Sequence, residues 1–255
     1  MITAVVLTHN DAAYLEKTLQ SLTWCDELIV IDDESTDNSV ALTKKYGVTV
    51  YTHELNADFA AQRNVGLAKA KEGWVLFVDS DEVVSKELAI EIQKAVSQQS
   101  SAKSIQGFFI KRTDYMWGRE LSHGETSDVR LLRLAKKGSG EWSRPVHEVW
   151  NVEGEKGNLD HPLLHFPHPT VSEFIRDVNR YSTVNANMLA SKHTPVYGWH
   201  ILAYPVAKFI RNYFFLSGFK DGIPGFCMAM IMSFHSFLTR AKLYMHYHNR
   251  IVPLP

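Results

Sequence analysis

Residues 74–82 read Trp74-Val75-Leu76-Phe77-Val78-Asp79-Ser80-Asp81-Glu82, an apolar run that ends in carboxylates. Such a run predicts a buried strand, and open α/β sheets bind their ligands at the carboxyl ends of the strands. In an extended chain alternate residues point the same way, so we expect Asp79 and Asp81 to face one Mg²⁺ or Mn²⁺ that holds a diphosphate. Acidic residues also end strands as turn formers and helix caps, so the pair indicates a nucleotide site only together with its neighbours.

Three further pairs of strand and helix are expected before this stretch. The expected strands are 2–7, 28–31 and 48–51, and the expected helices are 12–22, 38–46 and 59–70. Strands that alternate with such helices predict an α/β fold with a parallel sheet and right-handed crossovers. The carboxyl ends of the strands should therefore meet at one edge of the sheet.

Polar side chains follow the first two expected strands. Thr8 and Asn10 come after the first strand, and Asp32, Asp33 and Asp37 come after the second. Thr8 and Asn10 can cap the first helix and Asp37 the second, and capping is compatible with ligand contact. Asp32 and Asp33 are adjacent carboxylates, which repel one another unless a donor or a cation is near. A base or a ribose hydroxyl would supply that donor.

Four stretches of the chain carry a recognisable set of motifs. They are Val5-Val6-Leu7-Thr8-His9-Asn10, Ile31-Asp32-Asp33-Glu34-Ser35-Thr36-Asp37, Gln62-Arg63-Asn64-Val65-Gly66 and Phe77-Val78-Asp79-Ser80-Asp81-Glu82. In this order they resemble the motifs of family-2 glycosyltransferases, over roughly residues 1–150. The resemblance implies the nucleotide-diphospho-sugar transferase fold called GT-A, a mostly parallel sheet with helices on both faces. It also implies a divalent cation, Mg²⁺ or Mn²⁺, and inversion of the anomeric carbon.

The resemblance further implies roles for single residues. The residues expected to bind the nucleotide-sugar donor are Thr8, Asn10, Asp32, Asp33, Arg63 and Asp79. Thr8 and Asp33 match positions that contact the nucleobase, and Asp79 matches the region of the ribose and diphosphate. Asp81 matches the metal ligand. Glu34 departs from the pattern, because many members have Gly there; Gly permits φ > 0 and Glu resists it, so the geometry of this turn is in question.

The second half of the chain contains two more signature stretches. Residues 129–134, Val-Arg-Leu-Leu-Arg-Leu, and 142–148, Trp-Ser-Arg-Pro-Val-His-Glu, resemble those of small bacterial lipopolysaccharide core β-glucosyltransferases. An inverting transfer needs a base for the acceptor hydroxyl, and we expect Glu148 to be that base. His147 can complete the metal shell or bind phosphate. Arg130 and Arg144 can bind the diphosphate or an anionic acceptor, or can form cross-strand ion pairs.

Composition limits the classes of partner and compartment. The chain has 27 Lys and Arg against 28 Asp and Glu, a net charge of −1, and no run of like charges that would indicate nucleic acid. Cys25 and Cys227 lie far apart, so we expect no disulfide and a reducing compartment. The spacing of His161, His165 and His168 is not that of a standard zinc site. No basic segment precedes the apolar N-terminus, so we expect no signal peptide and a cytoplasmic protein.

Polar residues 98–104 form the expected connector within the glycosyltransferase domain. Residues 1–97 are expected to be its nucleotide-sugar-binding half and residues 105–168 its acceptor and catalytic half. Residues 170–255 are expected to form a helical, membrane-associating extension.

This extension has the composition of a segment at a lipid surface. Residues 199–219 mix aromatic and cationic side chains, as at a headgroup boundary. Residues 222–238 carry no formal charge, but a Pro-Gly pair interrupts their start and a full span needs about 20 apolar residues, so we expect a buried or membrane-embedded hairpin. The alternative is a helical pair that packs on the domain or on a second subunit. The cations expected to reach lipid phosphates are Lys208, Arg211, Arg240 and Lys242.

The sequence thus predicts an inverting hexosyltransferase with a UDP-sugar donor and a lipid-linked or lipopolysaccharide-type glycan acceptor. We expect it to work at the cytoplasmic face of a membrane as a peripheral protein. The alternatives are a polyprenyl-phosphate sugar transferase and a non-catalytic subunit that binds a sugar nucleotide. A dinucleotide oxidoreductase is disfavoured, because no G-x-G-x-x-G follows the first strand. The sugar, the linkage and the oligomeric state stay open.

Overall fold

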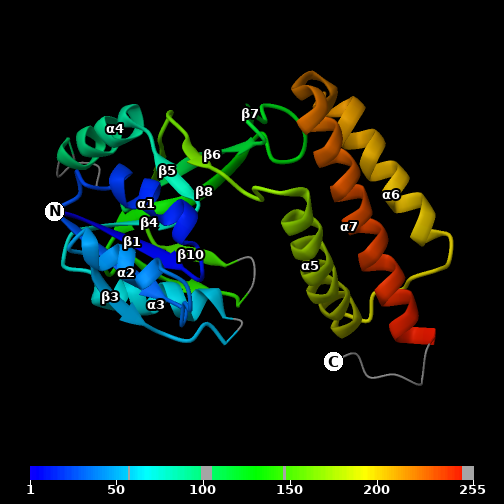
Figure 1. The fold of residues 1–255 in the computed structure, drawn as a ribbon, viewed down its shortest axis with the longest axis horizontal. Helices are drawn as coiled ribbons and strands as arrows, with labels where there is room; N and C mark the ends of the chain where they lie inside the picture. Colours follow the sequence, from blue (N-terminus) through cyan, green and yellow to red (C-terminus); the bar gives the residue numbers. More distant parts are fainter. Residues whose placement is uncertain (57, 99–104, 146–147, 249–255) are drawn as a thin grey trace. The chain divides into compact units, whose positions relative to one another are not determined.

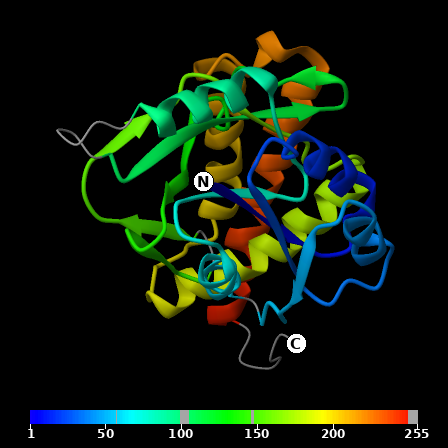
Figure 2. The same ribbon diagram turned by 90° about the vertical axis from the view of Figure 1, so that its left-hand side faces the viewer.

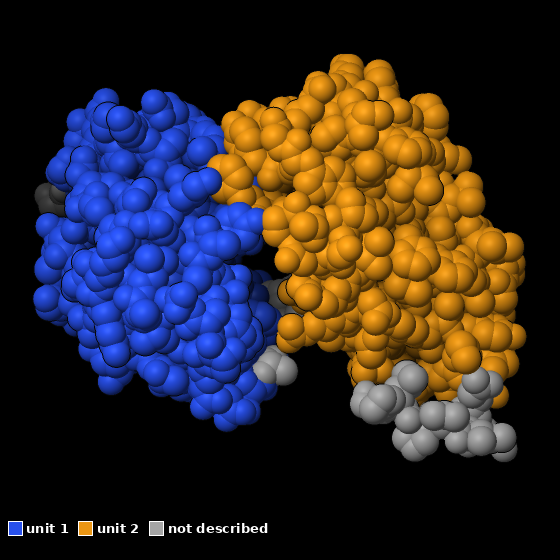
Figure 3. All heavy atoms as spheres, viewed as in Figure 1, with its two compact units in different colours: residues 1–113, 128–165 blue, residues 114–127, 166–255 orange. Residues whose placement is uncertain are grey.

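The structure is a computed structural model that describes residues 1–56, 58–98, 105–145 and 148–248 (Figure 1). The chain forms two compact units, one of residues 1–113 and 128–165 and the other of residues 114–127 and 166–255 (Figure 3). We call them unit 1 and unit 2. The segment 114–127, which the sequence assigned to the acceptor half, belongs to unit 2.

Unit 1 begins with the expected alternation of strands and helices. Its first elements are β1 (Ile2–Thr8), α1 (Ala12–Ser21), β2 (Glu27–Asp32), α2 (Ser39–Lys45), β3 (Thr49–Thr52), α3 (Phe59–Lys69) and β4 (Trp74–Asp79). The strands lie side by side in the order β3-β2-β1-β4, and every neighbouring pair is parallel. The predicted parallel sheet, with its carboxyl ends on one edge, is therefore confirmed.

The rest of unit 1 extends this sheet with strands of mixed direction. Its elements are β5 (Glu82–Val84), α4 (Lys86–Ser97), β6 (Gly107–Met116, which continues into unit 2), β8 (Val129–Lys136), β9 (Gly140–Ser143), β10 (Val149–Val152), β11 (Lys156–Asn158) and β12 (Leu163–His165). Strand β8 lies antiparallel between β4 and β6, and β5 pairs antiparallel with β12. Strands β9 and β10 form a separate hairpin. The carboxyl end of β4 thus lies where the parallel and antiparallel parts of the sheet meet.

Two apolar clusters cover the two faces of the sheet. On one face, Leu76 of β4 packs in a cluster with Leu15 of α1 and Leu88 of α4. On the other face, Phe77 packs in a cluster with Leu67 of α3 and with the β9–β10 hairpin. Figure 2 shows α4, in teal, over strands whose buried side chains share its cluster. The apolar run around β4 is buried on both faces, as its sequence predicts.

Gly66 lets α3 approach the sheet closely. A Cβ atom at this position would lie 2.5 Å from Cγ1 of Val5 and 3.3 Å from Cγ1 of Ile31. Only a residue without a side chain fits, so Gly66 sets the depth at which the preceding turn of α3 faces the strand ends.

Unit 2 consists of a short hairpin and a set of helices. Its elements are β7 (Arg119–Glu120), which pairs with the end of β6, α5 (Val171–Ser191), α6 (His200–Ile210), a π-helical turn (Arg211–Phe215), a 3-10 turn (Gly218–Asp221) and α7 (Gly222–His248). Helix α7 lies between α5 and α6 and packs against both (Figure 1). Met116 and Leu121 of the hairpin share a cluster with Phe174 and Val178 of α5, which explains why 114–127 belongs to this unit.

The structure corrects two expectations for the extension. The hairpin predicted in 222–238 is wrong, because Gly222–His248 is one continuous helix. Pro224 does not interrupt this helix, because it lies in the first turn. Proline lacks a backbone N–H, and in the first turn of a helix that group would have no intrahelical acceptor. Lys242 does not reach outward, because its Nζ donates to Asn179, Ser182 and Thr183 of α5 at 2.7–2.9 Å.

By length and composition, the run Gly218–His248 is a candidate membrane span among the described residues. Of its most apolar window, 28% is buried inside the protein. Core helices of soluble proteins meet the same criteria, so this observation by itself is weak evidence for a membrane.

The close approach at Gly66 leads to a stability prediction. Gly66→Ala should lower the free energy of unfolding by about 1–3 kcal/mol, because the new methyl group overpacks the face of the sheet. Gly198→Ala is the matched control, since nothing lies within 4 Å of a Cβ there. Urea unfolding measures both, and equal midpoints for the two variants would show that α3 does not lie this close to β1.

Candidate active site

The carboxylate of Asp79 lies between two buried arginines at the end of β4. Arg133 of β8 donates from Nη2 to Oδ2 at 2.6 Å, and Arg63 of α3 donates from Nη2 to Oδ1 at 2.8 Å. The two arginine side chains are 5% and 3% exposed. The sequence motifs predict Arg63 and Asp79 near the donor, and the structure brings the two into direct contact. These motifs did not indicate a role for Arg133.

Arg63 also binds Glu148, the residue expected to act as base. Nε and Nη2 of Arg63 lie 2.9 and 2.8 Å from Oε1 of Glu148. Asp79 and Glu148, 69 positions apart by number (148 − 79), are therefore joined through one guanidinium group. Because both contacts are to Oε1, the geometry leaves Oε2 of Glu148, whose side chain is 19% exposed, for other partners.

A third carboxylate, Glu82, completes this group. Its side chain is fully buried, its Oε2 accepts from the backbone N–H of Asp79 at 2.9 Å, and its Oε1 lies 3.5 Å from Arg133. Burial raises the pKa of Glu82, and the arginine only partly offsets this. Burial also acts to raise the pKa of Asp79, but the guanidinium groups of Arg133 and Arg63 outweigh it and hold that pKa well below its ordinary value. Asp79 therefore stays ionised.

Aromatic rings and an amide hold Arg63 in place. Its guanidinium lies 4.8 Å from the centroid of a ring of Trp142, which stacks on Trp150 at 5.1 Å. The neighbouring Asn64 accepts from the backbone N–H of Trp142 and donates to its carbonyl, both at 2.9 Å. Consecutive residues of α3 thus position both the arginine and the hairpin that leads to Glu148.

Three buried polar atoms at this edge of the sheet have no hydrogen-bond partner within the described residues. They are Nη1 of Arg63, Oγ1 of Thr8 and Oδ1 of Asp32. Thr8 and Asp32 lie opposite one another at the ends of β1 and β2, and Asp79 lies opposite Leu7. Buried polar groups are almost always paired, so these atoms mark a place where a ligand can supply donors and acceptors.

The loops after β1 and β2 are tied to one another. Oδ1 of Asn10 accepts from the backbone N–H groups of Thr36 and Asp37 at 2.8 and 3.2 Å. The capping role considered for Asn10 is therefore wrong. Asp37 accepts from the backbone N–H of Ser39, the first residue of α2, as the capping alternative predicted, and also from that of Ala12, the first residue of α1, which it did not predict.

Asp33 and Glu34 shape the second of these loops. Oδ1 of Asp33 accepts from the backbone N–H of Leu55 at 2.8 Å, and its Oδ2 lies 3.4 Å from His9. Glu34 has φ of 49°, so the turn keeps the left-handed geometry that Gly would favour, at some cost in strain.

Asp81 does not share a direction with Asp79. The chain turns at Ser80 and Asp81 instead of staying extended, so the alternation assumed from the sequence fails there. Oδ2 of Asp81 lies 3.2 Å from Nε2 of His165, which is opposite Glu82 in the pairing of β5 with β12. The sequence offered no sign that His165 lies at this site, because the pairing of β5 with β12 joins distant segments.

The other residues expected at the site lie in different places. Arg130 is exposed, and its Nη1 donates to the carbonyl of Leu159 at 3.2 Å. Arg144 is exposed with φ of 71°, and His147 lies outside the described residues. Arg133 carried a signal that was overlooked: an arginine between Leu132 and Leu134 of a buried strand requires a carboxylate partner.

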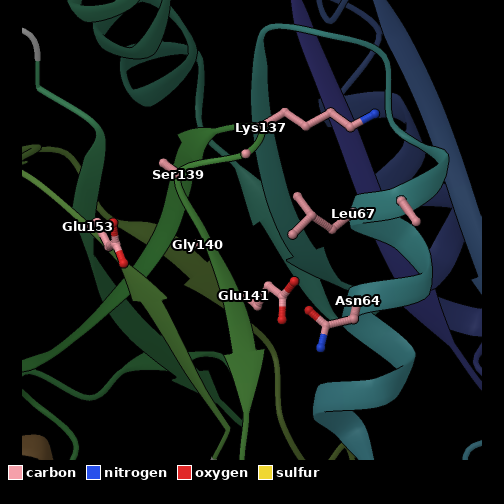
Figure 4. A pocket seen from close by; sticks show the side chains of 9 residues that line it. Asn64, Leu67, Lys137, Ser139, Gly140, Glu141 and Glu153 are labelled. Atoms are coloured by element: carbon pink, nitrogen blue, oxygen red, sulfur yellow. The ribbon is translucent and has the colours of Figure 1, made fainter.

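A hollow of about 490 Å³ lies between α3 and the β9–β10 hairpin (Figure 4). Leu67, Lys137 and Glu153 are among the residues that line it. It is close to the start of β4, because Lys136, the neighbour of Lys137, pairs with Trp74. This hollow therefore lies at the opposite edge of the sheet from Asp79 and is not the expected donor site.

Comparison with known proteins identifies the class. The sequence model of the family described as "Glycosyl transferase family 2" matches residues 3–149. Over 250 residues the chain is 30% identical to "Lipopolysaccharide core biosynthesis glycosyltransferase LpsC" of Rhizobium meliloti, covering 95% of this chain and 92% of that protein. An uncharacterized glycosyltransferase of Rickettsia bellii is 26% identical over 260 residues, covering 95% and 85% of the two chains.

A solved structure shares the fold. The crystal structure of S. aureus TarS 1–349 superposes with a TM-score of 0.50 at 15% identity and covers 99% of this chain and 93% of that one. The arrangement of sheet and helices is the GT-A fold. The chain belongs to glycosyl transferase family 2.

The buried contacts of Asp79 predict that two arginines of β8 contribute very differently to the free energy of unfolding. Arg133→Met should lower the free energy of unfolding by about 3–5 kcal/mol, because it leaves the buried Glu82 without its arginine and Asp79 with Arg63 alone. Arg130→Met, at an exposed position of the same strand, should change it by less than about 0.5 kcal/mol. Denaturant unfolding followed by circular dichroism compares them, and similar losses in both would refute a special role for Arg133.

Proposed function

We propose that the protein is an inverting glycosyltransferase that moves a hexose from UDP-sugar to a lipid-linked or lipopolysaccharide-type glycan. The observation that carries the proposal is Arg63, a buried arginine that joins Asp79 to Glu148 and keeps Nη1 without a partner among the described residues. A diphosphate oxygen is a suitable acceptor for that donor. The name of the R. meliloti relative, a lipopolysaccharide core biosynthesis glycosyltransferase, supports the acceptor class.

The ends of β1 and β2 are the proposed nucleoside site. Uracil offers an N–H donor between two carbonyl acceptors. The buried Oδ1 of Asp32 and the hydroxyl of Thr8 are unpaired among the described residues and complement such an edge. Asn10 and Asp33 act there by ordering the loops around the base, as their backbone contacts support.

The proposed cation, Mn²⁺ or Mg²⁺, would be held by Asp81 with His165. A carboxylate oxygen and an imidazole nitrogen 3.2 Å apart make a mixed donor set that suits Mn²⁺ better than Mg²⁺. When bound, the cation would neutralise charge on the leaving diphosphate. Asp79 is less suited to be a ligand, because both of its oxygens accept from arginines. Its role is to hold Arg63 and Arg133.

Glu148 is the proposed base. Arg63 fixes its Oε1, so Oε2 can take the proton of the acceptor hydroxyl as that oxygen attacks the anomeric carbon. The same guanidinium group connects the base to the carboxylate at the end of β4. A displacement of Asp79 or of Glu148 would therefore shift the other carboxylate through Arg63.

Unit 2 is proposed to rest on the cytoplasmic face of a membrane. No residue of α6 is buried, although the helix is mostly apolar. Leu202 is 71% exposed, Phe215 is 81% exposed and Ile223 is 75% exposed. Exposed apolar surface of this extent favours an interface with lipid or protein.

The metal assignment is tested by donor binding. Asp81→Asn and His165→Gln should each weaken Mn²⁺-dependent binding of UDP-glucose by at least about 10-fold and leave the fold intact. His161→Gln is the control, because His161 bonds to Glu91 and not to Asp81. Calorimetry with and without Mn²⁺ gives the result. Metal-dependent binding that survives in a folded Asp81→Asn protein would rule this cation site out.

The base assignment is tested by separating binding from transfer. Glu148→Gln keeps an oxygen for Arg63 but cannot take a proton, so transfer should fall by about 10²-fold or more while donor affinity stays near normal. Glu141→Gln, an exposed position of β9, should leave both unchanged. The assay uses lipopolysaccharide acceptors and a panel of UDP-sugars. Near-normal transfer by Glu148→Gln at saturating acceptor would place the base elsewhere.

A further inference from the structure

Unit 2 contains a hollow of its own, of about 470 Å³, among α5, α6 and α7. It is separate from the residues proposed to bind the donor, all of which belong to unit 1. Its lining combines cationic and apolar side chains with one carboxylate. Among the residues that line it are Glu125, Met188, Tyr204, Lys208, Arg211 and Arg240.

The hollow has an excess of positive charge. Lys208 is neutralised by Glu125, whose Oε2 lies 3.1 Å from its Nζ. Arg211 and Arg240 have no carboxylate partner among the described residues. Arg211 donates to Asn212 at 3.5 Å and Arg240 donates to Ser236 at 3.4 Å, both long hydrogen bonds. Two unbalanced guanidinium groups therefore line one hollow, a composition suited to an anion with several oxygens.

Arg240 is held in a half-buried position. Its Cζ lies 3.9 Å from the centroid of the ring of Tyr204. Burial lowers the pKa of Arg240, and also that of the neighbouring His235, which Lys208 lowers further. His235 therefore adds no charge at neutral pH, and an anion beside Arg240 would offset the unfavourable burial of its cation.

The walls of the hollow are apolar where they meet solvent. Met188 of α5 is 40% exposed and Tyr204 of α6 is 43% exposed. Both line the hollow, and α6 has no buried residue at all. A free anion would gain nothing from these side chains, whereas an anion carried on a hydrocarbon chain would bury them.

We propose that this hollow binds the phosphate group of an anionic lipid. Arg211 and Arg240 hold the phosphate oxygens, and Met188 and Tyr204 contact the glycerol and the first part of the acyl chains. Glu125 limits the affinity, because it neutralises Lys208. The inference deepens the proposed membrane contact, and it does not depend on which sugar is transferred or whether transfer occurs.

The test uses the full chain with phosphatidylcholine vesicles that contain or lack phosphatidic acid. Arg211→Gln/Arg240→Gln should reduce binding to phosphatidic acid vesicles about 25-fold, taking about five-fold for each cation near an anionic surface. Arg176→Gln/Arg180→Gln is the matched control: it removes the same charge from exposed positions of α5 that do not line the hollow. It should change binding only slightly. Glu125→Gln should increase binding, by about five-fold.

Soluble ligands separate the lipid from a free anion. By calorimetry, dihexanoyl phosphatidic acid should bind the wild-type chain more tightly than inorganic phosphate does, and Arg211→Gln/Arg240→Gln should bind neither. Equal affinity for the two ligands would overturn the lipid assignment and leave a plain phosphate site.

Two outcomes would overturn the site itself. One is an equal loss in the control variant, which would mean diffuse attraction of charges; the other is unchanged binding by a folded Arg211→Gln/Arg240→Gln protein. If circular dichroism shows that this variant does not fold, Glu125→Gln decides, and an unchanged affinity refutes the inference. A chain that binds phosphatidic acid but transfers no sugar would refute the proposed function and leave this inference intact.

Discussion

The arrangement of unit 1 depends on the ion pairs that hold Asp79 between Arg63 and Arg133. These pairs connect the end of the last parallel strand, the helix before it and the first antiparallel strand beside it. Removing charges from water is costly, and the cost is met here by short contacts on both oxygens of one carboxylate. Arg63 also binds Glu148, through Nε and Nη2, and so holds this carboxylate near the strand ends.

Packing around the site fixes the positions of these charged side chains. Gly66 lets α3 lie deep on the sheet, and Trp142 supports the guanidinium plane from the hairpin. Asn64 then fixes the hairpin to the helix through two backbone contacts. A site assembled from a helix, three strands and a hairpin is positioned by packing around it, because no single element supplies its parts.

Unit 2 is held together by contacts between helices and exposes much apolar surface. Helix α7 is held to α5 by Lys242, while α6 has no buried residue. The surface that results exposes apolar side chains, and its Arg211 and Arg240 have no carboxylate partner within the described part of the chain. These properties support the proposed contact of unit 2 with a membrane, whereas the unpaired polar atoms of unit 1 support the proposed nucleotide site.

The sequence by itself determined the alternation of strands and helices, because hydrophobic periodicity and strand-end polarity are local. It also placed Thr8, Asp32, Asp79 and Asp81 at the same edge of the sheet. Only the tertiary structure decided that Arg133, Glu82 and His165 join them, since the pairings of β4 with β8 and β5 with β12 link distant segments. The turn at Ser80 and Asp81 likewise overrode the alternation of an extended strand, and so sent two neighbouring carboxylates to different partners.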